Sequence, residues 1–150
     1  MTARRALYFE EFTEGETLGT RGRTITEADL VNFAGLTGDY NPLHTDAVYA
    51  ATTMMEKRVA HGMLTLSYAI GQAYPLGILE RTVLAFRSIE MKFSAPVYIG
   101  DTIHAEITVS NLKAAKRLGG GAVTLAMQVK NQAGKVVQKG DMVVLMMSKP

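Results

Sequence analysis

A long stretch without charge, residues 62–79, constrains the fold of this chain more than any other feature. A membrane-spanning helix needs about 20 mostly apolar residues, whereas this stretch is interrupted by Thr65, Gln72 and Pro75. We therefore expect no membrane span. A helix that is apolar nearly all round belongs inside a protein core. Residues 62–74 are predicted to form such a helix, and Pro75 is predicted to end it.

Apolar and polar residues alternate through the second half of the chain. A period of two is typical of strands that bury one face and expose the other. Turns that contain glycine separate consecutive runs, which predicts antiparallel neighbours. We expect an α+β fold in which helices come first and a four-stranded meander follows, curled around the buried helix. The predicted strands are 89–94, 102–110, 123–130 and 136–147, with a further one around 17–24.

Local signals in the first half predict two helices before the buried one. The run Thr26–Asp29 resembles a capping box, which starts a helix. Gly38 can end that helix in a left-handed turn. Residues 39–44 are expected to form the following loop, after which Thr45 or Asp46 can cap a short helix.

Length and charge limit the number of domains and the kinds of partner. The 150 residues are the size of one ordinary domain, so residues 1–150 are expected to fold as one unit. Net charge is only +2, and the cations are scattered. Nucleic-acid binders usually need a broader basic patch with stacking aromatic residues, so nucleic acid is not an expected partner. The densest basic run, residues 113–117, is interpreted as a solvated loop, with contact to a ligand's phosphates as the alternative.

The absence of cysteine excludes disulfides, thiolate metal sites and a cysteine nucleophile. Residues 1–5 lead into residues 9–12 without the apolar segment of a secretory leader. We therefore expect a cytoplasmic location.

Two short motifs carry the chemistry, and the first runs from Asp39 to His44. It places a carboxylate and an imidazole on one turn, with Asn41 and Pro42 between them. An isolated pair of this kind is usually part of a helix-terminal turn. Here Pro42 stiffens the loop and Asn41 can bond backbone or substrate, which favours two titratable groups held near one spot.

The second motif is His61-Gly62, at the start of the uncharged helix. A buried histidine bonded to a carbonyl, followed by a glycine chosen for close packing, would explain it structurally. In the functional interpretation, the Gly62 N–H at the positive end of the helix dipole stabilises a developing oxyanion. Asp39, His44, Asp46 and His61 could also be grouped as metal ligands, but no His-x-x-x-His helical spacing supports a metal site.

Taken together, the runs Gly38–His44 and Ala60–Met63 resemble the MaoC-like dehydratase family, which includes the (R)-specific enoyl-CoA hydratases. The order of helices and strands along nearly the whole chain is also similar. The resemblance implies a hot-dog fold, an antiparallel sheet wrapped around a long central helix. It also implies a homodimer or a higher homo-oligomer.

The resemblance further implies a role for each motif residue. Asp39 and His44 match the catalytic aspartate and histidine of the family, and Gly62 matches the glycine of its oxyanion hole. Asn41 matches an assisting asparagine. The residues assigned to substrate binding are Asn41, His61 and Met63.

The implied reaction is reversible hydration of a trans-2-enoyl thioester to an (R)-3-hydroxyacyl thioester. It needs a base for the attacking water, an acid for C2 and a donor for the thioester oxygen. No metal or redox cofactor is implied, because coenzyme A or acyl carrier protein is only the handle of the substrate. Two departures from the family pattern are Ala47, where relatives have proline, and Ile70, where some hydratases have a polar residue.

Two other functions remain open from the sequence. Many hot-dog thioesterases place a catalytic carboxylate on the central helix, but residues 62–79 contain no Asp or Glu. A non-catalytic subunit of a dehydratase heterodimer would be expected to have lost site residues, and this chain retains all of them.

Overall fold

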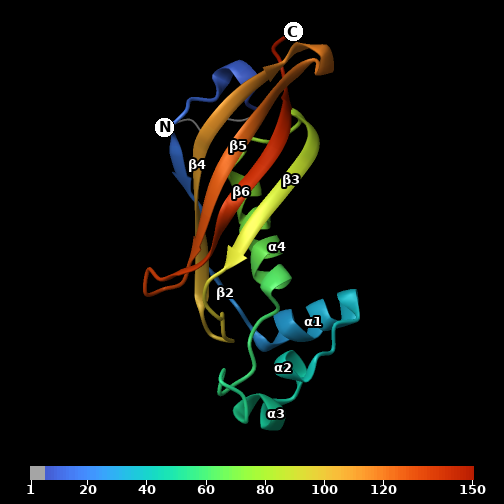
Figure 1. The fold of residues 1–150 in the computed structure, drawn as a ribbon, viewed down its shortest axis with the longest axis vertical. Helices are drawn as coiled ribbons and strands as arrows, with labels where there is room; N and C mark the ends of the chain where they lie inside the picture. Colours follow the sequence, from blue (N-terminus) through green and yellow to red (C-terminus); the bar gives the residue numbers. More distant parts are fainter. Residues whose placement is uncertain (1–5) are drawn as a thin grey trace.

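The computed structural model describes residues 6–150, so residues 1–5, on which the prediction of no leader partly rests, lie outside the described part. The main feature is an antiparallel six-stranded sheet with the order β1-β4-β5-β6-β3, in which β2 also pairs with β4. Figure 1 shows the sheet along the long axis of the molecule, with α4 packed against it. The strands are β1 (Thr17–Gly19), β2 (Arg23–Thr24), β3 (Val83–Phe93), β4 (Thr102–Ala115), β5 (Gly120–Lys130) and β6 (Val136–Met147).

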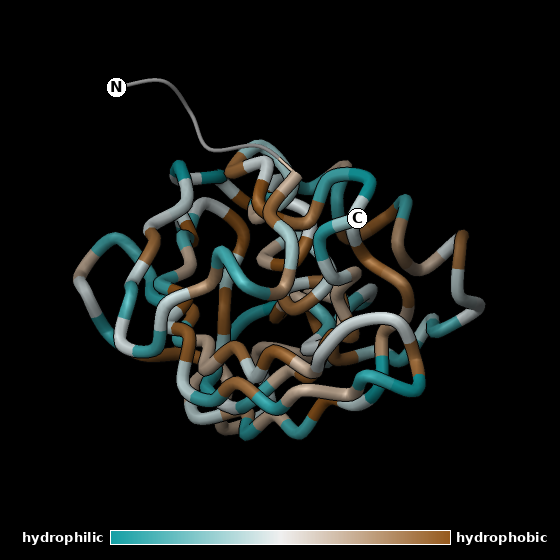
Figure 2. The backbone as a smooth tube through the Cα atoms, turned by 90° about the horizontal axis from the view of Figure 1, so that it is seen from above, coloured by the Kyte–Doolittle hydropathy of each residue, from teal (hydrophilic) through white to brown (hydrophobic). Residues whose placement is uncertain are grey.

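The predicted α+β class and antiparallel sheet are confirmed, and the alternation is visible in the burial of β4 and β5. Figure 2 shows it as a repeated change between hydrophobic and hydrophilic colour along the backbone. The strand predicted at 89–94 starts earlier, at Val83. Its first half was missed because β-bulges at Val83/Ala85 and Phe86/Ser88 interrupt the period of two. The single strand expected around 17–24 is divided into β1 and β2.

The predicted meander is correct for β4, β5 and β6 but wrong for β3. β3 pairs with β6 rather than with β4, the next strand along the chain. The connection from β3 to β4 is bonded to the beginning of β6, where the N–H groups of Ser94 and Ala95 both donate to the Val137 carbonyl, at 2.8 and 3.2 Å. Alternation reveals which face of a strand is buried, whereas it carries no information on the neighbouring strand.

Helix α4 (Gly62–Ala73) is the predicted central helix, followed by a 3-10 turn, Tyr74–Leu76, and by Gly77 in the left-handed region. One side of α4 packs into the core through Leu64, Leu66 and Ala69. The opposite side is open: Met63 is 55% exposed, and Ser67 and Gly71 are exposed as well. The expectation that the whole circumference is buried is therefore wrong for the single chain, because its sheet covers the helix from one side only.

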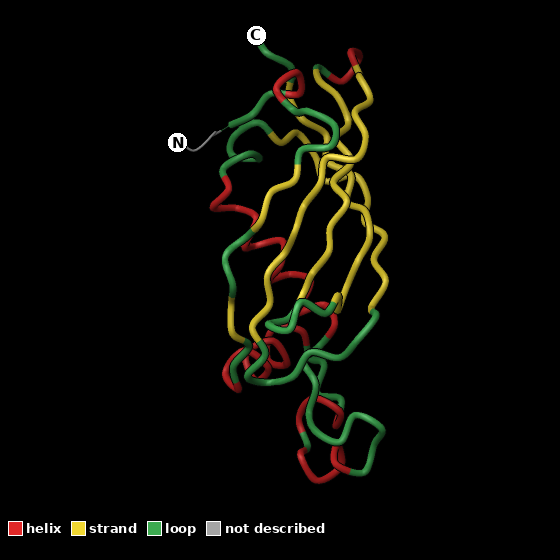
Figure 3. Tube along the Cα trace, turned by 90° about the vertical axis from the view of Figure 1, so that its left-hand side faces the viewer, coloured by secondary structure: helices red, strands yellow, loops and turns green. Residues whose placement is uncertain are grey.

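The short helices gather at one end of the sheet, beyond the strands, as Figures 1 and 3 show. They are α1 (Glu27–Thr37), α2 (Pro42–Thr45) and α3 (Ala47–Ala51). Helix α2 lies where a loop was predicted. It forms because Asn41 caps it, accepting from Leu43 N at 3.0 Å, and because Pro42 suits the first helical position. Within the described residues no helix is both long and apolar enough to cross a bilayer.

The predicted capping signals are confirmed in detail. Thr26 and Asp29 form the capping box of α1, and Gly38 ends that helix with φ of 78°. Asp46, rather than Thr45, caps α3 by accepting from Val48 N and Tyr49 N, each at 2.9 Å.

Asp29 also joins α1 to α4. Its carboxylate accepts from the Tyr68 hydroxyl at 2.8 Å and from Arg23, whose guanidinium lies over the Tyr68 ring at 3.6 Å. Burial raises the pKa of Asp29, but the hydrogen bonds from Thr26 and Tyr68 and the charge of Arg23 outweigh it and leave the pKa below its ordinary value. Burial and the neighbouring carboxylate raise the pKa of Tyr68 above its ordinary value.

We predict that Asp29→Asn destabilises the protein at pH 7 by about 1–2 kcal/mol, the usual loss for a helix cap. The lowered pKa means that the ionised Asp29 stabilises the fold above its unfolded pKa, and that this stabilisation is lost as the pH falls through the folded pKa. Urea unfolding at several pH values measures the effect. The difference between wild type and variant should shrink below about pH 4, and a difference that does not change with pH would contradict the assignment.

Candidate active site

Asp39 lies directly after the turn that ends α1, with its carboxylate exposed at the edge of the helical end of the molecule. One carboxylate oxygen accepts from Asn41 N at 3.2 Å. The Asp39 backbone carbonyl accepts from Nε2 of His61 at 3.0 Å. The side chain is therefore held by its own turn, and its backbone by the start of α4.

His44 projects from α2 with its ring held on one side. Its Nδ1 lies 2.7 Å from the Val59 carbonyl oxygen, and since a carbonyl can only accept, Nδ1 carries the proton. In the neutral ring Nε2 is then the free acceptor. The Arg58 Nε–H donates to the His44 carbonyl at 2.7 Å.

His61 packs behind these two residues. It is 2% exposed, and its ring stacks on His44 with centroids 3.8 Å apart and planes 27° apart. Phe33 borders the other side at 5.0 Å. Potential ligand atoms of Asp39, His44 and His61 all lie within 4.8 Å of one another. The structure thus brings together the two motifs that the sequence singled out.

Gly62 is the first residue of α4, so its N–H has no acceptor within the helix. Two strands hold this residue. The Gln138 Nε2 on β6 donates to the Gly62 carbonyl at 2.8 Å, and the Phe93 ring on β3 lies against its α-carbon. A β-carbon at this position would come within 2.9 Å of Phe93, so only glycine fits without a shift.

The other predicted substrate-binding residues lie around this point. Met63 follows Gly62 in α4 and is exposed, and Asn41, two residues after Asp39, is exposed too, although the Asn41 side-chain oxygen is already occupied in capping α2. His61 is buried, donates to the Asp39 carbonyl and stacks on the His44 ring, so its contacts are with these two residues. No contact in the chain tests a role in substrate binding for any of the three, and these assignments stay predictions.

Two hollows include residues of the site, one at Gly62 and one at His44. One, of about 480 Å³, opens at Gly62 and is lined by Met54, Met55, Phe93, Tyr98 and Gln138. The other, of about 210 Å³, lies between α1 and α2 and is bordered by His44 and Arg58. Apolar side chains predominate in the first, which suits an acyl chain.

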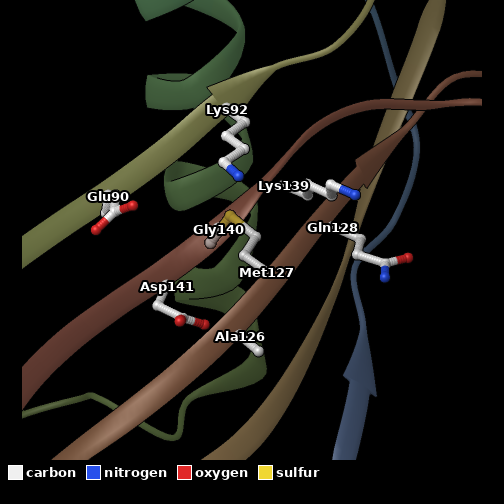
Figure 4. Close-up of a pocket in the computed structure, with 8 residues that line it drawn as sticks. All are labelled: Glu90, Lys92, Ala126, Met127, Gln128, Lys139, Gly140 and Asp141. Carbon is white, nitrogen blue, oxygen red and sulfur yellow. The ribbon is translucent and has the colours of Figure 1, made fainter.

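A third hollow, of about 370 Å³, lies on the outer face of the sheet. Figure 4 shows its side chains in front of β3, β5 and β6, with α4 behind the strands. Charges of both signs line it, from Glu90, Lys92, Lys139 and Asp141. It contains none of the motif residues, and we interpret it as the solvated face of the sheet.

Arg58 and Gln138 were missed by the sequence analysis. Gln138 had a detectable signal, because it lies in the same phase of β6 as the buried Met142, Val144 and Met146, and a polar residue in an apolar phase is unusual. Arg58 had none, since a single arginine before His61 is indistinguishable from a surface cation.

The residues weighed as metal ligands are only partly available. Asp39, His44 and His61 are close enough together to hold an ion. Asp46 does not belong to this group. Its carboxylate caps α3 instead. The donor set is therefore two histidines and one exposed carboxylate.

An antiparallel sheet packed on one long helix defines a hot-dog protein, and here an aspartate and a histidine lie near the start of that helix. The chain belongs to the MaoC like domain family, whose profile matches residues 10–141.

The similarity extends to individual relatives. The chain is 37% identical to the (R)-specific enoyl-CoA hydratase of Rhodospirillum rubrum over 92% of this chain and 90% of that protein. A protein of Archaeoglobus described as a monoamine oxidase regulatory protein has a similar structure, with a TM-score of 0.93 and 38% identity over the whole of both chains. A Mycobacterium tuberculosis protein with a double hot-dog fold matches at a TM-score of 0.84 and 22% identity, over 97% of this chain and 45% of that one. The predicted family and hot-dog fold are confirmed.

We predict that Gly62→Ala destabilises the protein by about 1–3 kcal/mol, since the added methyl group overpacks against Phe93. In a Phe93→Ala background the same change should cost much less. Urea unfolding of the four proteins measures this coupling.

Gly35→Ala is the matched control. It lies within α1, and its β-carbon would meet only the Tyr40 hydroxyl oxygen at an ordinary 3.7 Å. That change should stabilise the protein by about 0.5–1 kcal/mol. Equal effects at Gly62 and Gly35 would refute the packing argument.

Proposed function

We propose that this protein is an enzyme that reversibly hydrates a trans-2-enoyl-CoA to the (R)-3-hydroxyacyl-CoA. The observation that carries the proposal is the juxtaposition of Asp39, the free Nε2 side of His44 and the first-turn N–H of α4. The similarity to an (R)-specific enoyl-CoA hydratase over nearly the whole chain supports the same reaction and the same stereochemistry of the product.

In the proposed mechanism, a water molecule lies between Asp39 and His44. As its oxygen attacks C3, one member of the pair takes its proton, and a proton is delivered to C2, so that no net proton is gained or lost. The Val59 contact supports a proton on Nδ1, so that in the neutral ring Nε2 is the acceptor. Asp39, held by the Asn41 N–H, supplies the second titratable group.

The Gly62 N–H would bind the thioester oxygen, on which negative charge develops in the transition state. A donor at a helix start adds the favourable end of the helix dipole. Contacts from Gln138 and Phe93 fix the position of this residue, which is what preorganised electrostatic stabilisation requires. The apolar hollow beside Gly62 would take the acyl chain, with coenzyme A or acyl carrier protein as the handle.

We further propose that the enzyme uses no metal or redox cofactor. Every step above is a proton transfer or an interaction with a developing oxyanion, and the residues present can supply both. Incubation with a chelator should therefore leave the turnover unchanged.

The protein is also proposed to act as a homodimer joined through β3. This strand is an edge of the sheet, and among the described residues 6–150 it pairs only with β6. Its side chains Leu84, Phe86, Ile89 and Phe93 are exposed. A long apolar edge is a template for pairing with another strand. A second copy paired along β3 would continue the sheet and could cover the open side of α4.

Asp39→Asn and His44→Gln are each predicted to lower turnover by at least ~10²-fold, the low end for a general acid or base. Loss of enoyl-thioester absorbance with crotonyl-CoA and longer enoyl-CoA substrates measures the rate. The control is His104→Gln, on the outer face of β4, which should retain wild-type turnover. Folded pair variants with wild-type turnover would sink the mechanism, and a wild type inactive on all substrates would favour a non-catalytic subunit.

For the interface, we expect Phe86→Lys combined with Ile89→Lys to convert the dimer to a monomer. Two charges at this edge would remain unpaired in the interface. Light scattering coupled to size-exclusion chromatography gives the mass. The matched control is Thr17→Lys on the opposite edge strand, which should leave the mass unchanged, and a double variant that remains dimeric would show that β3 is not the interface.

A further inference from the structure

Arg58 makes three directed hydrogen bonds to two separate parts of the molecule. Its Nε–H donates to the His44 carbonyl at 2.7 Å. Its two terminal nitrogens donate to the two carboxylate oxygens of Glu27, at 3.0 and 2.8 Å. Only a planar guanidinium can make a paired contact with a carboxylate and still donate through Nε.

We propose that Arg58 is a positioning residue that fixes His44 for the hydration reaction. This inference rests on the proposed function and assigns a role to a residue that does not itself touch the substrate. In this role Arg58 and Glu27 act as one unit, called here the clamp.

His44 needs such support because α2 cannot hold it. The helix is four residues long, and so short a helix has too few internal hydrogen bonds to be stable alone. Its orientation depends on contacts with residues 58, 59 and 61. Val59 N donates to the Leu43 carbonyl at 3.3 Å, Val59 O accepts from the His44 ring, and Arg58 holds the His44 carbonyl. The His61 ring stacks on that of His44. Of these contacts, the Arg58 contact is the one hydrogen bond donated to α2 by a side chain.

The other end of the clamp is anchored to rigid structure. Glu27 is the first residue of α1, whose first turn is held by the Thr26–Asp29 capping box. Asp29 in turn accepts from Tyr68 of α4. These hydrogen bonds, linked through the first turn of α1, therefore relate His44 to the same helix whose first residue, Gly62, is the proposed oxyanion donor.

A role in stabilising the fold explains the contacts of Arg58 less well than a role in positioning His44. The Glu27 side chain is 59% exposed, which lowers the contribution of its ion pair to folding, although the paired geometry with the mostly buried Arg58 retains part of it. The Nε contact, by contrast, ends on the backbone of a proposed catalytic residue. Loss of the clamp should therefore affect turnover more than it affects unfolding.

The test compares Arg58→Gln and Arg58→Lys with wild type. We expect kcat to fall by about 10- to 100-fold in both, because a small displacement of a catalytic group has an effect of this size. KM should change by less than about threefold, since the substrate contacts are untouched. Lysine keeps the charge but cannot contact His44 and Glu27 together, so retention of wild-type kcat by Arg58→Lys would reduce the role to charge alone and overturn the proposal.

Glu27→Gln tests whether the two residues act as one unit. Alone it should lower kcat less than Arg58→Gln does, because the Nε contact to His44 survives. Combined with Arg58→Gln it should cause no further loss, since residues of one unit are non-additive. Full additivity of the two effects would contradict the clamp. The matched control is Lys130→Gln, which breaks the 2.6 Å Lys130–Glu106 pair on the outer face of the sheet and should leave kcat unchanged.

A readout that does not need activity separates this inference from the proposed function. Long-range ¹H–¹⁵N spectra report which ring nitrogen of His44 carries the proton. In wild type the proton should lie on Nδ1, against Val59, and in Arg58→Gln that preference should weaken. Inactive wild-type protein with the ring preference lost in the variant would refute the hydratase and support the clamp. An unchanged ring preference in Arg58→Gln would overturn the clamp, whatever the activity.

Discussion

The hydrogen bond between the His44 ring and the Val59 carbonyl is the contact on which the site depends. It is 2.7 Å long and joins α2 to the segment that leads into α4, which are separate elements of the chain. Because the acceptor is a carbonyl, the bond also decides which ring nitrogen faces outward. One backbone oxygen thus sets both the position and the tautomer of the proposed catalytic imidazole.

Residues next to Val59 in the sequence also hold the 39–44 segment. Arg58 holds the His44 backbone, and His61 stacks on the His44 ring while donating to the Asp39 carbonyl. Residues 58–62 therefore serve as a template against which the 39–44 segment is placed. A template of this kind suits acid/base chemistry, which tolerates little displacement between the groups that exchange protons.

The sheet contributes at the other end of the site. Gly62 lies between Phe93 of β3 and Gln138 of β6, which are directly paired in the sheet. The start of α4 is consequently fixed by two strands rather than by its own cap, for the His61 side chain makes no capping bond. The long central helix thus provides an oriented N–H, and the sheet decides where that N–H points.

Much of this could be predicted from local sequence, because caps, turns and alternation are decided by neighbouring residues. The capping box of α1, the left-handed Gly38, the cap of α3 and the buried faces of β4 and β5 were all predictable in this way. The family motifs also singled out Asp39, His44 and Gly62 as a group, and in the structure Asp39 and His44 lie close to His61, the residue before Gly62.

Contacts between distant segments were not predictable. The pairing of β3 with β6, the open side of α4, and the approach of Arg58 and Gln138 to the site all depend on how elements pack. Sequence by itself determined which residues can do chemistry and which faces are apolar, since both are properties of side chains and their spacing. Tertiary structure alone decided which strand lies beside which, and which side chains hold the site residues. The contacts of Arg58 and Gln138 with the site join positions 14 and 76 residues apart, and β1 and β4 pair across 91 residues.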